Sequence, residues 1–136
     1  MHPNNILPYV WAKQNEKGVQ CLSRQTLGSP SKDLDEVLEK LKQVLDTMFE
    51  EYTQVVTDLG LEEVIQNDDN LRIPKELNAI RNCLDMYDQE YMVKECIRGT
   101  VCGEGFATRQ HLAGCIALWK SESYIDDELQ EEIKKL

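Results

Sequence analysis

The sequence predicts an all-α fold, a helical bundle with two long antiparallel helices and shorter C-terminal helices. Two observations favour this class. Apolar residues recur at intervals of three and four along two long segments, which is the spacing of one helix face. No stretch of useful length shows the strict alternation of polar and apolar residues that marks a half-buried strand. With 136 residues the chain has the size of one domain with a modest core.

The first long helix is expected to begin near residues 29–31, where a proline suits a first helical position and Asp33 with Glu36 has capping-box spacing. Gly60 is expected to end it, because glycine readily adopts the left-handed conformation of a C-cap. A short helix is expected over residues 61–66. The long helix carries an unbroken heptad stripe of Leu34, Leu38, Leu41, Leu45, Met48, Tyr52, Val55 and Leu59, widened by Val37, Val44, Phe49 and Val56.

The second long helix is expected to follow Pro74 and to end between residues 99 and 103. Thr108 can cap a shorter helix, and Ser123 with Asp126 can cap a last one, because these side chains accept hydrogen bonds from the first backbone N–H groups of a helix. The C-terminal third is therefore expected to add two short helices to the pair of long ones.

Residues 1–30 are expected to form a flexible, proline-containing N-terminal arm in front of a helical bundle domain of residues 31–136. Prolines and glycines interrupt this arm repeatedly, which disfavours a long helix. An apolar cluster at residues 6–11 stands out within it. This cluster could fold back onto the bundle or dock as a short linear element on another protein.

The composition favours a soluble intracellular protein that does not bind nucleic acid or membranes directly. Asp and Glu (25) outnumber Lys and Arg (15), giving a net charge of −10, and such a surface repels phosphate backbones and anionic lipids. No apolar run approaches the roughly 18 residues that a membrane span needs. Five cysteines occur without a secretory signal in the first residues, which favours reduced thiols.

One group of residues has the side-chain types of a metal or thiol site: Cys96, Cys102, His111 and Cys115. Structural zinc sites bring cysteines in close pairs, and this chain has no such pair. A nucleophilic cysteine needs a base, and His111 precedes Cys115 by one helical turn, but no third orienting group is evident. We therefore expect no enzymatic activity, cofactor or metal. A zinc or thiol protein that uses Cys102, His111 and Cys115 stays as an alternative.

Protein–protein interaction is the remaining class of function. A long helix that is apolar on two flanks needs a large covering surface, and one long helix with two short ones would leave part of it for a partner. Aromatic residues exposed on such a face would be binding hot spots. By residue type the candidates are Tyr87, Tyr91, Trp119 and Tyr124, each of which could equally be a core residue.

Three segments carry a family resemblance: "MFEEYTQVVTDLGLEEVIQ" at 48–66, "LNAIRNCLDMYDQEYMVKECI" at 77–97 and "HLAGCIALWKSESYIDDELQEEI" at 111–133. Their order resembles the AIRIM-type ribosome maturation factors, small helical subunits of a type II AAA+ unfoldase complex. The latter two also look like the C-terminal part of the CINP-type subunit, the partner in that complex. The shared features are Phe49, Tyr52, Gln54, the hinge at residues 59–61 with Val64 and Ile65, Tyr87, Tyr91, Lys94 and Trp119.

The resemblance implies a non-enzymatic adaptor that pairs with a CINP-like subunit and docks on AAA+ ATPase subunits. It also implies a role in maturation of the large ribosomal subunit, a further role in replication-linked protein unfolding, and a location in cytoplasm and nucleus. Phe49 and Tyr52 join the candidate partner-binding residues on this basis. A generic coiled-coil subunit of a kinetochore, spindle or tethering complex is an alternative that the heptad stripe would also suit.

Overall fold

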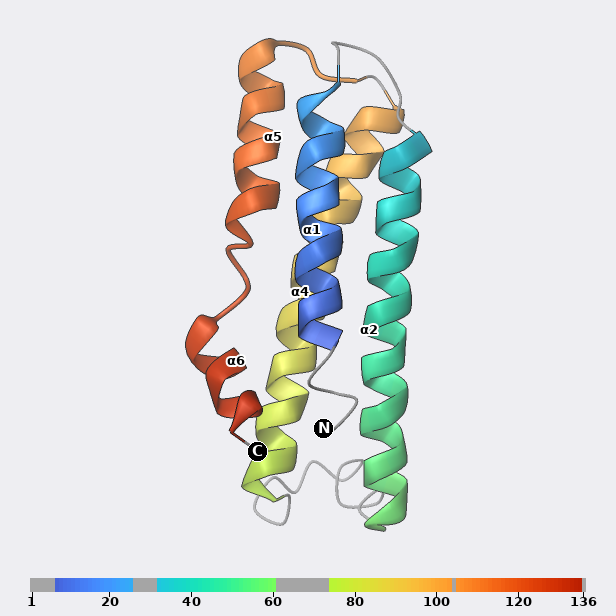
Figure 1. The fold of residues 1–136 in the computed structure, drawn as a ribbon, viewed down its shortest axis with the longest axis vertical. Coiled ribbons are helices and arrows are strands. Elements are labelled where there is room, and N and C mark those ends of the chain that lie inside the picture. Colours follow the sequence, from blue (N-terminus) through green and yellow to red (C-terminus); the bar gives the residue numbers. More distant parts are fainter. Residues whose placement is uncertain (1–6, 26–31, 61–73, 104, 136) are drawn as a thin grey trace.

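The protein is described by a computed structural model, in which residues 7–25, 32–60, 74–103 and 105–135 are placed. These residues form helices and no strand, which confirms the all-α class (Figure 1). The helices are α1 (Leu7–Ser23), α2 (Lys32–Asp58), α4 (Lys75–Cys102), α5 (Arg109–Ser121) and α6 (Asp127–Lys134).

The helices make a bundle in which α1, α2 and α4 alternate in direction, and α5 followed by α6 forms a fourth, broken edge (Figure 1). α1 packs against α2 and α5, whereas α4 packs against α2, α5 and α6. The two long helices α2 and α4 are antiparallel, as predicted. None of the described helices combines the length and apolar character that crossing a bilayer requires.

α1 corrects the prediction of a flexible arm, which is wrong for Leu7–Ser23. Pro8 lies in the first helical turn, where its missing N–H removes no intrahelical bond. Gly18 lies in the middle of the helix because the Trp119 ring occupies the space of a side chain, and a Cβ there would lie 2.2 Å from Trp119 Cζ2. Trp11 is 2% exposed, and Leu7 and Val10 pack against the core, so the described part of the apolar cluster folds back onto the bundle.

Most predicted helix boundaries are confirmed. α2 ends at Asp58, and Gly60 adopts a φ of +68° just beyond it. The Thr108 side chain caps α5 by accepting from the His111 N–H, and Asp126 caps α6 by accepting from the Glu128 N–H. Residues 29–31 and the predicted short helix at 61–66 lie outside the described residues.

The core lies where α1 covers the two long helices. The heptad stripe of α2 is buried from Leu34 to Met48. The residues of this part of the stripe are between 0% and 8% exposed. Beyond this point the stripe opens, since Tyr52 and Val55 are half-buried and Leu59 is 57% exposed. α1 has 17 residues against 27 in α2, and Figure 1 shows it beside the first part of α2 only.

Candidate functional site

The six predicted partner-binding residues do not share one environment. Tyr87 and Trp119 are core residues, at 1% and 0% exposure. Tyr52 and Tyr91 are half-buried. Phe49 and Tyr124 are exposed, at 36% and 50%. The structure therefore brings Tyr87 and Trp119 into the interior and leaves Phe49 and Tyr124 accessible to a partner.

A lysine that the sequence analysis did not single out as a site lies at the centre of the bundle. The Lys94 side chain, on α4, is completely buried. Its ammonium donates to the carbonyl oxygen of Trp119 at 3.0 Å and lies 4.7 Å from the centre of the Trp119 ring. Carboxylate oxygens of Glu90 and Glu122 lie 3.6 and 3.5 Å away. Lys94 thus places a cation at the C-terminal end of α5, where the helix dipole and free carbonyls favour one.

Two indole rings connect α1 to this lysine. Trp11 Nε1 donates to Glu122 Oε2 at 2.7 Å, and Trp119 Nε1 donates to the backbone oxygen of Asn15 at 3.0 Å. The Trp11 ring also meets the Tyr87 ring edge-on, with centroids 5.0 Å apart. We call Lys94, Glu90, Glu122, Trp11, Trp119 and Asn15 the Lys94 cluster.

The break between α5 and α6 is held by the Lys94 cluster. Glu122, the residue after α5, has a φ of +45°, in the left-handed region that favours glycine. A side chain there costs of order 1 kcal/mol. Trp11 and Lys94 both bind the Glu122 carboxylate, so tertiary contacts offset the local strain. Residues of α1 and α4 thus stabilise the turn between α5 and α6.

The charges of the cluster do not balance when all three groups are ionised, because Lys94 faces two carboxylates. Burial raises the pKa of Glu90, and Lys94 only partly opposes this effect. Burial also lowers the pKa of Lys94, against the opposing effects of Glu122 and Glu90. Neither Glu90 oxygen has a well-formed hydrogen bond within the described part of the chain. Glu90 is therefore the carboxylate of the cluster that most favours a bound proton.

The Lys94 cluster positions helices and does not offer a surface to a substrate. Lys94 and Glu90 are both 0% exposed, so a dissolved molecule cannot reach their charged atoms. A sequence signal for the cluster does exist. Tyr87, Glu90, Lys94, Ile97 and Val101 follow one another at helical spacings of three and four and are all buried. Charged residues inside an apolar stripe are seldom buried unless paired.

The thiol and metal alternative gains no support from the geometry. No three His, Cys, Asp or Glu side chains in the described ranges are grouped so that they could hold a metal. Cys96 and Cys102 are exposed, and the Cys102 thiol lies 3.6 Å from Asp35 Oδ1. Burial raises the pKa of the Cys115 thiol, which disfavours the thiolate that a nucleophile needs. The His111 ring meets the Phe106 ring edge-on.

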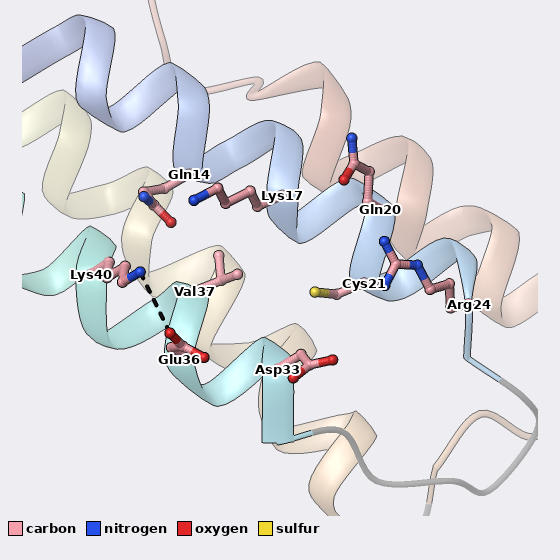
Figure 2. Close-up of a pocket in the computed structure, with 9 residues that line it drawn as sticks. All are labelled: Gln14, Lys17, Gln20, Cys21, Arg24, Asp33, Glu36, Val37 and Lys40. Carbon is pink, nitrogen blue, oxygen red and sulfur yellow. Dashed lines mark ion pairs between the residues drawn. The ribbon is translucent and has the colours of Figure 1, made fainter.

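A groove of about 330 Å³ runs between α1 and α2 (Figure 2). Figure 2 shows Lys17 and Arg24 on its α1 side and Asp33 on its α2 side, and Lys40 is paired there with Glu36 at 3.5 Å. Cations thus lie on both sides of the groove, and the Lys40–Glu36 pair lies within α2. Such exposed pairs contribute little stability, and the groove lacks the apolar lining with a few convergent polar groups that is typical of small-molecule sites.

The far end of α2 has a different character. We call the second half of its heptad stripe, Tyr52, Val55 and Leu59, together with the flanking Phe49 and Val56, the open end. Val56 packs with Leu77 of α4 in a small cluster that is separate from the main core. Phe49 and Leu59 remain exposed on the same stripe. An apolar helix face without full coverage is typical of a protein-binding surface.

In comparison with known proteins, no family model, curated protein or solved structure matches this chain. Its function is therefore inferred from its own residues.

Proposed function

We propose that this protein is a non-enzymatic helical adaptor, which pairs through the open end of α2 with a second helical subunit. The observation that carries the proposal is the change in exposure along one stripe. Leu41 and Leu45 are 0% and 4% exposed, whereas Phe49 is 36% exposed and Leu59, one residue beyond the end of α2, is 57% exposed. A helix of a partner would extend the coverage that α1 gives to the first half of α2.

Exposure distinguishes the predicted hot-spot residues that belong to the core from those that a partner could contact. Tyr87 and Trp119, which the family resemblance includes, serve the interior of this bundle. Phe49, Tyr52, Tyr91 and Tyr124 have accessible surface and are the aromatic residues that we assign to partner binding. Aromatic anchors of this kind commonly dominate the binding energy of an interface.

The resemblance supplies the identity of the proposed partners. We propose a CINP-like helical subunit as the direct partner and type II AAA+ ATPase subunits as the machine that the pair serves. The ATPases would supply the energy for protein unfolding in maturation of the large ribosomal subunit and in replication-linked unfolding. This role places the adaptor in the cytoplasm and the nucleus.

The test is affinity capture of the tagged chain from cell lysate, followed by mass spectrometry, with two matched variants. Phe49→Asp with Leu59→Asp places two charges on the open end, while Thr53→Asp with Thr57→Asp places two charges on exposed positions outside the stripe. We expect the unmodified chain and the threonine variant to recover an AAA+ ATPase pair with a CINP-like subunit. The Phe49 and Leu59 variant should lose them.

Three outcomes would contradict the proposal in whole or in part. Equal capture by both variants would place the interface elsewhere on the bundle. Capture of none of these partners by the unmodified chain would remove the AAA+ assignment. Capture of a kinetochore, spindle or tethering complex instead, with the same dependence on Leu59, would establish the coiled-coil alternative.

A further inference from the structure

The open end of α2 differs from the rest of the helix in charge as well as in coverage. Residues 43–60 contain Asp46, Glu50, Glu51 and Asp58 and no lysine or arginine. Asp46, Glu50 and Asp58 are exposed. Arg81 and Asp85 of α4, one of each sign, lie near Tyr52 and leave this surface with an acidic excess. Such an excess attracts partners of the opposite sign and disfavours others.

Two of these acidic residues border the exposed stripe. Glu51 and Asp58 each stand one position before a stripe residue, Tyr52 and Leu59, and seven residues separate the two acids. Residues seven apart lie on the same side of a helix. The acidic groups therefore form one edge of the apolar face, where charged residues of a docked helix would lie.

Two polar atoms at this end are buried without a partner in the described part of the chain. They are the Tyr52 hydroxyl oxygen and Glu51 Oε2, on adjacent residues of the open end. A buried acceptor without a donor costs about 1 to 3 kcal/mol. The Glu51 side chain is only half-buried, so a lysine or arginine of a partner could pair with its carboxylate where that group meets solvent.

We propose that the open end of α2 binds a basic amphipathic helix of the partner, with its apolar face on Tyr52 and Leu59 and its lysines or arginines toward Glu51 and Asp58. This inference rests on the proposed function and adds the chemistry of the partner. Residues 49–59 span roughly 16 Å at 1.5 Å per residue, which matches three turns of a docked helix. The acidic edge selects against an acidic helix of the same shape.

The experiment uses three synthetic peptides and the full chain. Each peptide has about 14 residues, near the shortest length at which helices form in water, with leucines at heptad positions and either lysine, glutamine or glutamate at the flanking positions. Binding is followed by fluorescence anisotropy of a labelled peptide at low and high salt. We expect the lysine peptide to bind most tightly and to weaken as salt rises.

A pair of charge-reversed variants makes the test specific to the open end. Glu51→Lys with Asp58→Lys should weaken the lysine peptide by about tenfold. Glu36→Lys with Glu39→Lys changes the net charge equally, from −10 to −6 since each substitution adds two, and should leave binding unchanged. If the first variant does not fold, Asp58→Lys alone, at an exposed position, should give a smaller loss in the same direction.

The outcomes separate this inference from the proposed function. Equal binding of the lysine, glutamine and glutamate peptides, each lost with Leu59→Asp, would keep the docking face and overturn the basic partner. Binding of none of them would overturn the docking face itself. A monomer–dimer equilibrium in sedimentation that Leu59→Asp abolishes would show that a second copy of this chain covers the face, which also overturns the inference.

Discussion

The two halves of α2 carry one heptad stripe in two different surroundings. In the first half, α1 and α4 cover the stripe from both sides, and leucines such as Leu41 are inaccessible to water. In the second half, α1 is absent and Leu59 is exposed. The apolar pattern alone does not distinguish the halves, because burial depends on how far α1 extends along α2. The covered half stabilises the fold, and the open half is the surface that we propose for partner binding.

The largest effect is expected at Leu45, in the covered half. Leu45→Asp puts an unpaired charge where 4% of the side chain is exposed, and should lower the free energy of unfolding by about 4 to 5 kcal/mol. Chemical denaturation followed by circular dichroism measures this loss. A loss under about 1 kcal/mol would show that the covered half is not a packed seam.

The Lys94 cluster should respond almost as strongly. Lys94→Ala leaves the carboxylates of Glu90 and Glu122 without their cation and should cost about 3 to 5 kcal/mol, as breaking a buried ion pair does. Lys40→Ala is the matched control, since Lys40 also pairs with a glutamate but is exposed, and it should cost under about 1 kcal/mol. Similar losses in a denaturation series would argue against the buried cluster.

The contact of α1 with α5 is tested at Gly18. Gly18→Ala brings a Cβ to 2.2 Å from the Trp119 ring and should cost about 1 to 3 kcal/mol through overpacking. Gly114→Ala provides the opposite case, because no atom lies within 4 Å of its Cβ position inside α5. That substitution should stabilise the protein by up to about 1 kcal/mol. Thermal unfolding of the two variants should therefore shift in opposite directions.

Glu90 gives the Lys94 cluster a dependence on pH. Its pKa is raised by burial in the folded state, so it contributes stability below its ordinary pKa of 4.5 and loses that contribution as pH rises through the folded-state value. Glu90→Gln removes the titration and should stabilise the protein by about 1 kcal/mol at neutral pH. The gain over the unmodified chain should disappear in acid. Parallel stability curves from acid to neutral pH would contradict this assignment.

The smallest effect is expected at the open end. Leu59→Asp changes a side chain that is 57% exposed and should alter the free energy of unfolding by less than about 0.5 kcal/mol. Measured beside Leu45→Asp, it compares the same substitution at two positions of one stripe. A loss of several kcal/mol at Leu59 would mean that this end is packed, which would remove the difference between the halves.

The fold class and four of the helices follow from the sequence because their signals are local. Heptad spacing, Pro74, and caps such as Thr108 act within a few residues of each other. α1 was missed because Pro8 and Gly18 were weighed as helix breakers without regard to position. The reason for a glycine at position 18 lies in Trp119, about a hundred residues away, and local spacing carries no trace of it.

The candidate sites divide in the same way. The open end of α2 was predicted in outline, since a stripe longer than one neighbour covers can be seen in the sequence. The Lys94 cluster was missed, although Glu90 and Lys94 stand at buried positions of the α4 pattern. Charged residues are not expected to be buried, and the sequence does not show that Glu122 and the end of α5 lie against Lys94 and compensate its charge. Long-range pairing is the information that local periodicity lacks.

The hydrogen bonds between α1 and the end of α5 can form only late in the synthesis of these residues, because they join distant parts of the chain. A ribosome adding about 5 to 20 residues per second needs roughly 5 to 20 s to make the 104 residues from Asn15 to Trp119. During that interval Trp11 has no Glu122 to bind, and the Trp119 ring that packs over Gly18 has not yet been made. The first helix can pack against α2 as soon as α2 has been made, whereas its contact with α5 has to wait for Trp119. A chain interrupted before Trp119 would therefore lack the hydrogen bonds that hold α1 to the end of α5.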